Sequence, residues 1–194
     1  KIDPANALNL PTPAGSIESL ISTELGVTSK SELSSQYSVR GGSYDENIVY
    51  VNGIEIYRPL LIRSDQQEGL SFINPNMTES VQFSSGGFDA HYGDKMSSVL
   101  DITYKKPKAF EASATASLLG ASGYVGSRTR NLSQVTGVRY KTTKSLLGST
   151  DTDAEYEPSF LDVQTYITYE FLPKWEISFL GNLSNNKYQF TPKS

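Results

Sequence analysis

Residues 79–107 read ESVQFSSGGFDAHYGDKMSSVLDITYKKP, and the rest of the chain is interpreted from this stretch outward. It opens on a β-patterned run, Ser80 to Phe83, and closes on a second, Val99 to Tyr104, whose β-branched and aromatic residues suit a half-buried strand. Between them, three glycines permit backbone angles that other residues avoid, while Phe88 and Tyr92 offer rings that can anchor a loop. The stretch predicts a strand, a compact loop and a returning strand.

Two shorter turn signals lie upstream. Residues 48–57, IVYVNGIEIY, predict a β-hairpin, because Asn52 and Gly53 tolerate the positive φ that a type I′ turn requires. Residues 37–42, YSVRGG, predict a strand that ends at two glycines, and residues 45–47, Asp-Glu-Asn, predict an acidic turn after it. Clustered oxygens in that turn could suit calcium, but a solvated turn is the preferred explanation.

A helix is predicted near the N-terminus. Ser16 can cap it, and Ile17, Leu20, Ile21 and Leu25 recur at helical spacing, with a glycine at position 26 as the stop. Further along, the pair at positions 74 and 75, Asn-Pro, predicts a short helical turn. The first part of the chain is therefore expected to combine short helices with a small sheet.

Beyond Pro107, apolar and polar residues alternate along several runs. The clearest are residues 161–171 and 175–184, with weaker runs at 110–118, 121–128 and 132–144 and a longer acidic connection at 145–159. The clearest runs are about as long as the 9–11 residues with which a tilted strand crosses a bilayer. The pattern predicts about five transmembrane strands, too few to close a barrel, so a longer protein is expected. A soluble β-sandwich with one wet face gives the same alternation and stays open.

Composition excludes several kinds of site. The chain has no cysteine, which removes disulfides and thiolate metal sites, and its one histidine, His91, cannot form a multi-histidine centre. Residues 151–157 alternate acids as a calcium loop does but carry Tyr156 where glycine is required. No nucleophile motif accompanies His91, and no basic stripe marks a nucleic-acid surface. We therefore expect a protein that is not an enzyme, with no cofactor, no metal and no nucleic-acid partner.

Taken in order, the segments 37–42, 48–57 and 79–107 resemble the plug domain of TonB-dependent outer-membrane receptors, with its Arg-Gly element, its Asn/Asp-Gly hairpin and its final strand-loop-strand unit. The resemblance implies an α+β plug domain, a small mixed sheet with short helices, over residues 1–108. It implies that residues 109–194 are the first antiparallel transmembrane β-barrel strands of a roughly 22-stranded plugged barrel.

The resemblance also implies a function. Such receptors import a scarce solute, namely a siderophore, a vitamin, a glycan or a peptide, with energy from the proton-motive force delivered by TonB and its inner-membrane energising complex. The protein is then expected in the Gram-negative outer membrane, surrounded by lipid, with the plug facing the periplasm and with a surface lipoprotein as a possible partner. Two alternatives stay open: a non-transporting module for surface binding or partner docking, and a soluble β-rich binding domain.

The same resemblance assigns residue roles. Arg40 and Glu79 match the charged residues that tie the plug to the barrel wall, although Ser85 stands where the family often has a second arginine. The ligand-facing loops are expected at residues 43–47, 63–71 and 88–95. The residues predicted to face the ligand are Tyr44, Asp45, Arg63, Asp65, Phe88, His91 and Tyr92.

Overall fold

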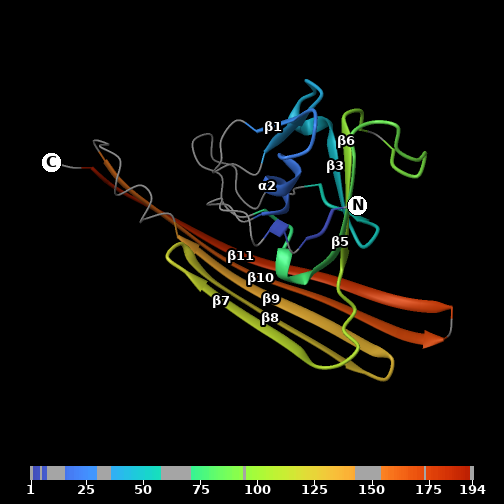
Figure 1. Ribbon diagram of the computed structural model, residues 1–194. Helices are drawn as coiled ribbons and strands as arrows, with labels where there is room; N and C mark the ends of the chain where they lie inside the picture. Colours follow the sequence, from blue (N-terminus) through green and yellow to red (C-terminus); the bar gives the residue numbers. More distant parts are fainter. Residues whose placement is uncertain are drawn as a thin grey trace. The chain divides into compact units, whose positions relative to one another are not determined.

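In a computed structural model of the 194-residue chain, the described residues are 2–4, 6–7, 16–29, 36–57, 71–93, 95–142, 154–172 and 174–192. The chain divides into two compact units, Lys1–Lys105 and Lys106–Ser194. The helices and strands carry the labels of Figure 1.

The first unit contains a four-stranded sheet in the order β4–β3–β6–β5. At its centre β3 (Asn47–Val51) and β6 (Ser98–Tyr104) run parallel, whereas β4 (Ile54–Glu55) and β5 (Thr78–Ser84) pair antiparallel at the edges. The strand and returning strand predicted from residues 79–107 are β5 and β6. The mixed sheet confirms the predicted α+β plug architecture.

The predicted hairpin lies between β3 and β4. Asn52 and Gly53 have φ values of 51° and 76°, in the left-handed region that a type I′ turn needs. The Asn52 N–H donates to the Ile102 carbonyl at 2.8 Å, and the Asn52 side-chain oxygen accepts from the Tyr104 N–H at 2.9 Å. The turn is thereby fastened to β6. The second arm is shorter than predicted, because β4 ends at Glu55.

Ser16 caps the predicted helix, since its hydroxyl accepts from the Ser19 N–H at 3.2 Å. The helix, α2, spans only Ile17–Ile21, and its apolar residues are buried. The prediction that Leu25 shares their face is wrong, because the side chain is 95% exposed. Helical spacing applies only while the helix continues, and α2 ends four residues before Leu25.

Four smaller elements lie in the described part of the first unit. Strands β1 (Val27–Ser29) and β2 (Tyr37–Val39) pair antiparallel, and a 3-10 turn, η1, covers Tyr44–Glu46. The helical turn predicted after Asn74 is η2 (Pro75–Met77), which the Asn74 side chain caps. No helix in the described part of the chain is long and apolar enough to cross a membrane.

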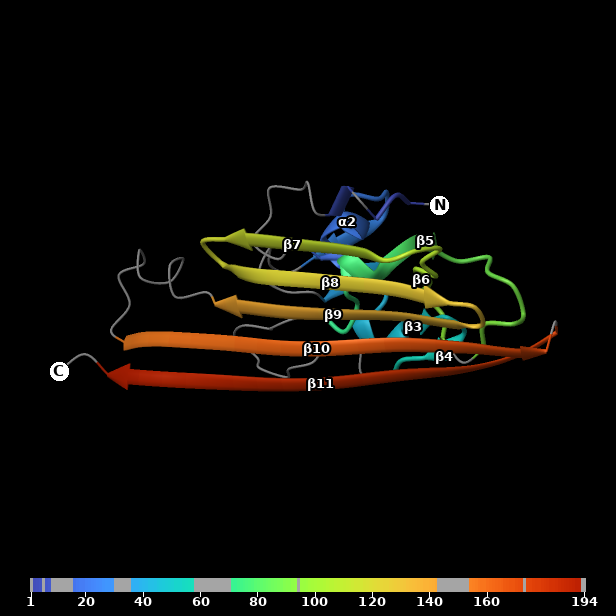
Figure 2. The same cartoon turned by 90° about the horizontal axis from the view of Figure 1, so that it is seen from below.

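The second unit contains five antiparallel strands in the order β11–β10–β9–β8–β7, so each strand pairs with its neighbours in sequence (Figure 2). They are β7 (Glu111–Ser117), β8 (Gly120–Thr129), β9 (Leu132–Thr142), β10 (Ala154–Leu172) and β11 (Trp175–Pro192). The five strands confirm the number and order that the alternating runs predict. The sheet is open in this chain.

The last two strands are longer than predicted. β10 has 19 residues and begins at Ala154, inside the stretch that the sequence assigns to an acidic connection, and β11 has 18 residues. Ser159 pairs with Thr142, the last residue of β9, and among the described residues the five before it pair with β11 alone. Apolar and polar residues still alternate along 154–158 and 187–192, and backbone pairing of these two stretches extends the strands into the predicted connection.

Register divides the side chains of the second unit between two faces, because successive residues of a strand point to opposite sides. On one face Ile177, Phe179 and Leu183 are 63%, 58% and 77% exposed. On the other face Asp162, Gln164 and Thr168 are at most 2% exposed, alongside the buried rings of Phe160 and Tyr166. A soluble sandwich buries its apolar face and solvates its polar face. The observed arrangement is the reverse, and it contradicts that alternative.

Candidate functional site

Two of the three loops predicted to face the ligand lie side by side. The Lys95 ammonium donates to the Asp45 carbonyl at 2.5 Å. Ser97 donates through its hydroxyl to the Glu46 carboxylate at 2.5 Å and through its N–H to the Glu46 carbonyl at 3.1 Å. The loops meet because β3 and β6 are parallel, so the segments that lead into the two strands arrive at the same edge of the sheet.

A cluster of aromatic rings lies against one face of the sheet. The Tyr92 hydroxyl donates to the Asp101 carboxylate at 2.6 Å, and Asp101 on β6 is the register partner of Tyr50 on β3. The Tyr50 and Tyr92 rings are 5.3 Å apart, and the His91 ring is 5.1 Å from Tyr92 and 6.4 Å from Tyr50. Edge-to-face and tilted contacts at these distances are favourable for aromatic rings.

The sequence prediction included His91 and Tyr92 but missed Tyr50 and Asp101. Tyr50 could have been found, because it stands between Val49 and Val51 in a strand and so must face away from these two buried residues. Asp101 could not be connected with Tyr92 without the loop geometry. We call Tyr50, His91, Tyr92 and Asp101 the aromatic cluster.

The cluster fixes the protonation state of one phenol. The hydrogen bond to the Asp101 carboxylate, then partial burial and the negative charges of that carboxylate and of Asp89, raise the pKa of Tyr92 to about 12. A phenol that donates to a carboxylate resists ionisation, because losing the proton would place two negative charges together. Tyr92 is therefore a neutral hydrogen-bond donor at physiological pH.

The other predicted ligand-facing residues have varied surroundings. Tyr44 lies in η1 with its ring edge-to-face against Tyr37 at 6.2 Å, and Asp45 beside it is exposed. Phe88 is half-buried. Arg63 and Asp65 lie outside the described residues. The end of that third loop, Ser71, is buried and donates a hydrogen bond to the Glu18 carboxylate.

Arg40 and Glu79, which the sequence assigns to plug anchoring, are both exposed. Arg40 has a φ of 50° in the turn after β2, and its Nη1 atom is 3.4 Å from where a Cβ on Gly86 would lie. Within the residues that the structure describes, neither side chain forms an ion pair. Their pairing with a barrel wall stays a prediction.

The buried face of the second unit carries charges that the sequence prediction did not single out. Arg139 on β9 and Asp162 on β10 form an ion pair at 2.6 Å, and the Asn182 amide on β11 donates to the other Asp162 oxygen at 2.5 Å. Arg128 approaches Glu170 at 3.4 Å. The alternation in the sequence indicates which face of the sheet a side chain takes. The strand register decides which of these residues lie opposite one another and can pair.

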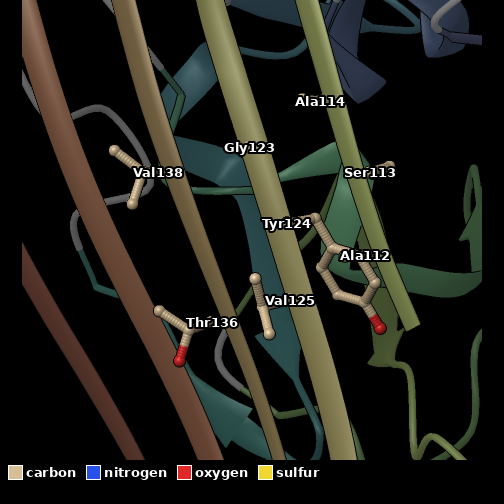
Figure 3. Close-up of a pocket in the computed structure, with 8 residues that line it drawn as sticks. All are labelled: Ala112, Ser113, Ala114, Gly123, Tyr124, Val125, Thr136 and Val138. Atoms are coloured by element: carbon tan, nitrogen blue, oxygen red, sulfur yellow. The ribbon is translucent and has the colours of Figure 1, made fainter. Parts of the chain in front are cut away.

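A hollow of about 480 Å³ lies on β7, β8 and β9 (Figure 3). It is lined by Ala112, Ser113, Ala114, Gly123, Tyr124, Val125, Thr136 and Val138. The hollow forms where small residues, alanine on β7 and glycine on β8, occupy facing positions of the two strands. The Thr136 hydroxyl is bonded to Thr165 at 3.0 Å, so the hollow offers few polar groups to a hydrophilic solute.

Comparison with known proteins identifies the first unit. Residues 5–99 match the family described as TonB-dependent Receptor Plug Domain. A comparison with curated protein sequences gave no match. The residues that match include β3, the hairpin turn, β5 and the loop that carries the aromatic cluster.

Solved structures share the fold of the whole chain. The siderophore receptor PirA from Pseudomonas aeruginosa has a TM-score of 0.68 and 17% identity, over 97% of this chain and 34% of the receptor. PirA from Acinetobacter baumannii has a TM-score of 0.65 and 16% identity, over 98% and 32%. A variant of the ferric enterobactin receptor PfeA from Pseudomonas aeruginosa, in complex with enterobactin, has a TM-score of 0.64 and 15% identity, over 96% and 33%. The chain thus spans about a third of their length.

The fold and the family match together define a plug domain followed by the first strands of an outer-membrane β-barrel. Residues 5–99 belong to the TonB-dependent receptor plug domain family, and the chain as a whole shares the fold of the plug and first barrel strands of the solved receptors. Proteins of this class reside in the outer membrane with the plug on the periplasmic side, as the sequence predicted.

Proposed function

We propose that the protein imports a scarce extracellular solute through its barrel and that TonB, with its inner-membrane energising complex, supplies energy from the proton-motive force. The observation that carries this proposal is one chain in which a plug domain precedes a sheet with exposed apolar residues and buried polar ones. A sheet of that kind suits lipid on one side and a polar lumen on the other.

The adjacent loops at residues 43–47 and 88–95, with the aromatic cluster, are proposed as the ligand-facing part of the plug. The cluster offers three rings, a neutral phenolic donor and a carboxylate within one small area. Rings with a few fixed polar groups are typical of small-molecule sites. This chemistry accommodates a siderophore, a vitamin, a glycan or a peptide, and the similar solved receptors make ferric siderophores the first candidates.

The experiment compares uptake by the intact receptor in cells with and without TonB. Ferric siderophores, a corrinoid vitamin, oligosaccharides and short peptides are supplied one class at a time, and both surface binding and internal accumulation are measured. Accumulation of one class should require TonB and disappear when a protonophore collapses the proton gradient, whereas binding should persist. Binding without TonB-dependent accumulation of any class would instead identify a non-transporting module.

The loop assignment has its own test. Replacing His91 by Ala, or Tyr50 by Ala, should weaken binding of the imported solute about tenfold or more, because each ring is central to the cluster. Thr103→Ala is the matched control, since Thr103 is an exposed position on β6 with no role in the cluster. Unchanged affinity in both ring variants would remove the cluster from the ligand site.

A further inference from the structure

The segment that joins β6 to β7 makes a specific contact with the far edge of the second sheet. The Lys106 ammonium lies 2.9 and 2.7 Å from the two oxygens of the Glu176 carboxylate, and both residues belong to the second unit. Glu176 is on β11, whereas the segment continues into β7. Since β7 and β11 are the two edge strands, the segment starts at one edge and enters the sheet at the other.

Glu176 lies in an unusual place for a carboxylate, because its register partner on β10 is another carboxylate, Glu170. Like charges directly opposite each other destabilise a strand pair. Two basic residues from elsewhere compensate: Arg128 on β8 approaches Glu170 at 3.4 Å, and Lys106 approaches Glu176 at 2.7 Å. The acidic pair therefore forms a local site of negative charge that favours a cation, and the joining segment supplies one.

The residue after Lys106 makes the contact easier to maintain. Pro107 is buried, its ring fixes its own φ, and it restricts the preceding residue to extended conformations. Lys106 therefore loses less backbone freedom when it is held than a residue in an unrestricted loop would lose. Lys108, Ala109 and Phe110 beyond the proline are exposed.

We propose that Lys106 and Glu176 form a linker clamp, a positioning contact that holds the start of the plug-to-barrel linker on the fifth strand. The start of the linker is then held at β11 as well as through the peptide chain at β7. Because the side chains are 41% and 34% exposed, the clamp is a weak, salt-sensitive contact that opens and recloses. Opening it frees the linker as far as β7.

The test is trypsin cleavage of the purified full-length receptor after Lys108, a bond that substitutions at 106 and 176 leave unchanged. Cleavage of a transiently open segment follows the population of its open state. Glu176→Gln and Lys106→Gln should each raise the cleavage rate severalfold, up to about tenfold. Glu170→Gln is the matched comparison, because it removes the opposite acid without touching the residue that contacts Lys106, and it should raise the rate less than either of these substitutions.

Exchanging the two charges distinguishes loss of the Lys106–Glu176 ion pair from a general destabilisation of the sheet as the cause of faster cleavage. The receptor with both Lys106→Glu and Glu176→Lys should return to nearly the wild-type rate, whereas Lys106→Glu alone should be cleaved fastest. Added salt should raise cleavage of the wild type but not of Glu176→Gln. Wild-type cleavage rates in both Gln variants, or an exchanged receptor cleaved as fast as Lys106→Glu alone, would overturn the proposal. The assay requires no ligand and no TonB, so its outcome is independent of the proposed import.

Discussion

Arg139 and Asp162 are register partners on β9 and β10 and form a buried ion pair, in which Nε and Nη2 of the arginine lie 3.0 and 2.6 Å from one carboxylate oxygen. Asn182 on β11 donates to the other oxygen, so three neighbouring strands share one carboxylate. Breaking such a pair leaves a buried charge poorly compensated. The arrangement specifies which residues of the three strands lie opposite each other.

Replacing Asp162 by Asn should destabilise the barrel by about 3–5 kcal/mol, because the carboxylate charge that faces Arg139 is lost at a site with no exposure. Urea unfolding of the full-length receptor in detergent measures the change. Glu170→Gln is the control, because the Arg128–Glu170 pair is 34% and 44% exposed and should contribute about 1 kcal/mol or less. Equal effects of the two substitutions would contradict the importance of burial.

Gly120 should not tolerate a side chain. Its φ is 148°, and a Cβ there would lie 2.0 Å from the Tyr140 carbonyl oxygen, a backbone atom that cannot move away without disturbing β9. Gly120→Ala is expected to cost about 1–3 kcal/mol or more and to reduce the yield of folded receptor. At Gly123 on the same strand the nearest atom would be 4.0 Å from a Cβ, so Gly123→Ala should fold normally. A normal yield of Gly120→Ala would refute the expected clash.

The plug hairpin should depend on Asn52 for two reasons. Asn52→Ala removes the acceptor for the Tyr104 N–H and places alanine at a φ of 51°, which together should cost about 2–3 kcal/mol. The measurement is the hydrogen-exchange rate of the Tyr104 amide in the full-length receptor. Asn52→Asp keeps an acceptor oxygen and a side chain that tolerates this φ, so it should lose less protection. Similar exchange in the two variants would show that the side-chain acceptor is unimportant.

The phenol of Tyr92 should titrate near pH 12, above the ordinary value of about 10. Because the pKa is raised in the folded protein, the folded state holds this proton more tightly than the unfolded chain does. The resulting stabilisation is present below about pH 10 and is lost as the pH rises toward about 12. The difference in tyrosinate absorbance between wild type and Tyr92→Phe isolates the group. A midpoint near 10 would show that the bond to Asp101 is absent.

Local patterns in the sequence determined much of the fold. Period-two alternation defined the strands from residue 110 onward, Asn52-Gly53 defined the hairpin, and Ser16 defined the start of α2. Each of these follows from the geometry of a few neighbouring residues, namely the pleat of a strand, the φ of a turn or the free N–H groups of a helix end. Helical spacing predicted wrongly that Leu25 would be buried with the apolar residues of α2, because the helix has already ended before that residue.

Only the tertiary structure decided which distant residues meet. The parallel pairing of Asn47 with Ser98 brings the loops before β3 and β6 together and places Tyr50 beside Asp101. Lys106 reaches Glu176 across 70 residues because the meander puts β11 at the far edge from β7. The alternation of a strand says which face a side chain takes, but a shift of register by two residues preserves every face and changes every partner. Side-chain periodicity therefore cannot choose among these pairings, whereas the folded sheet does.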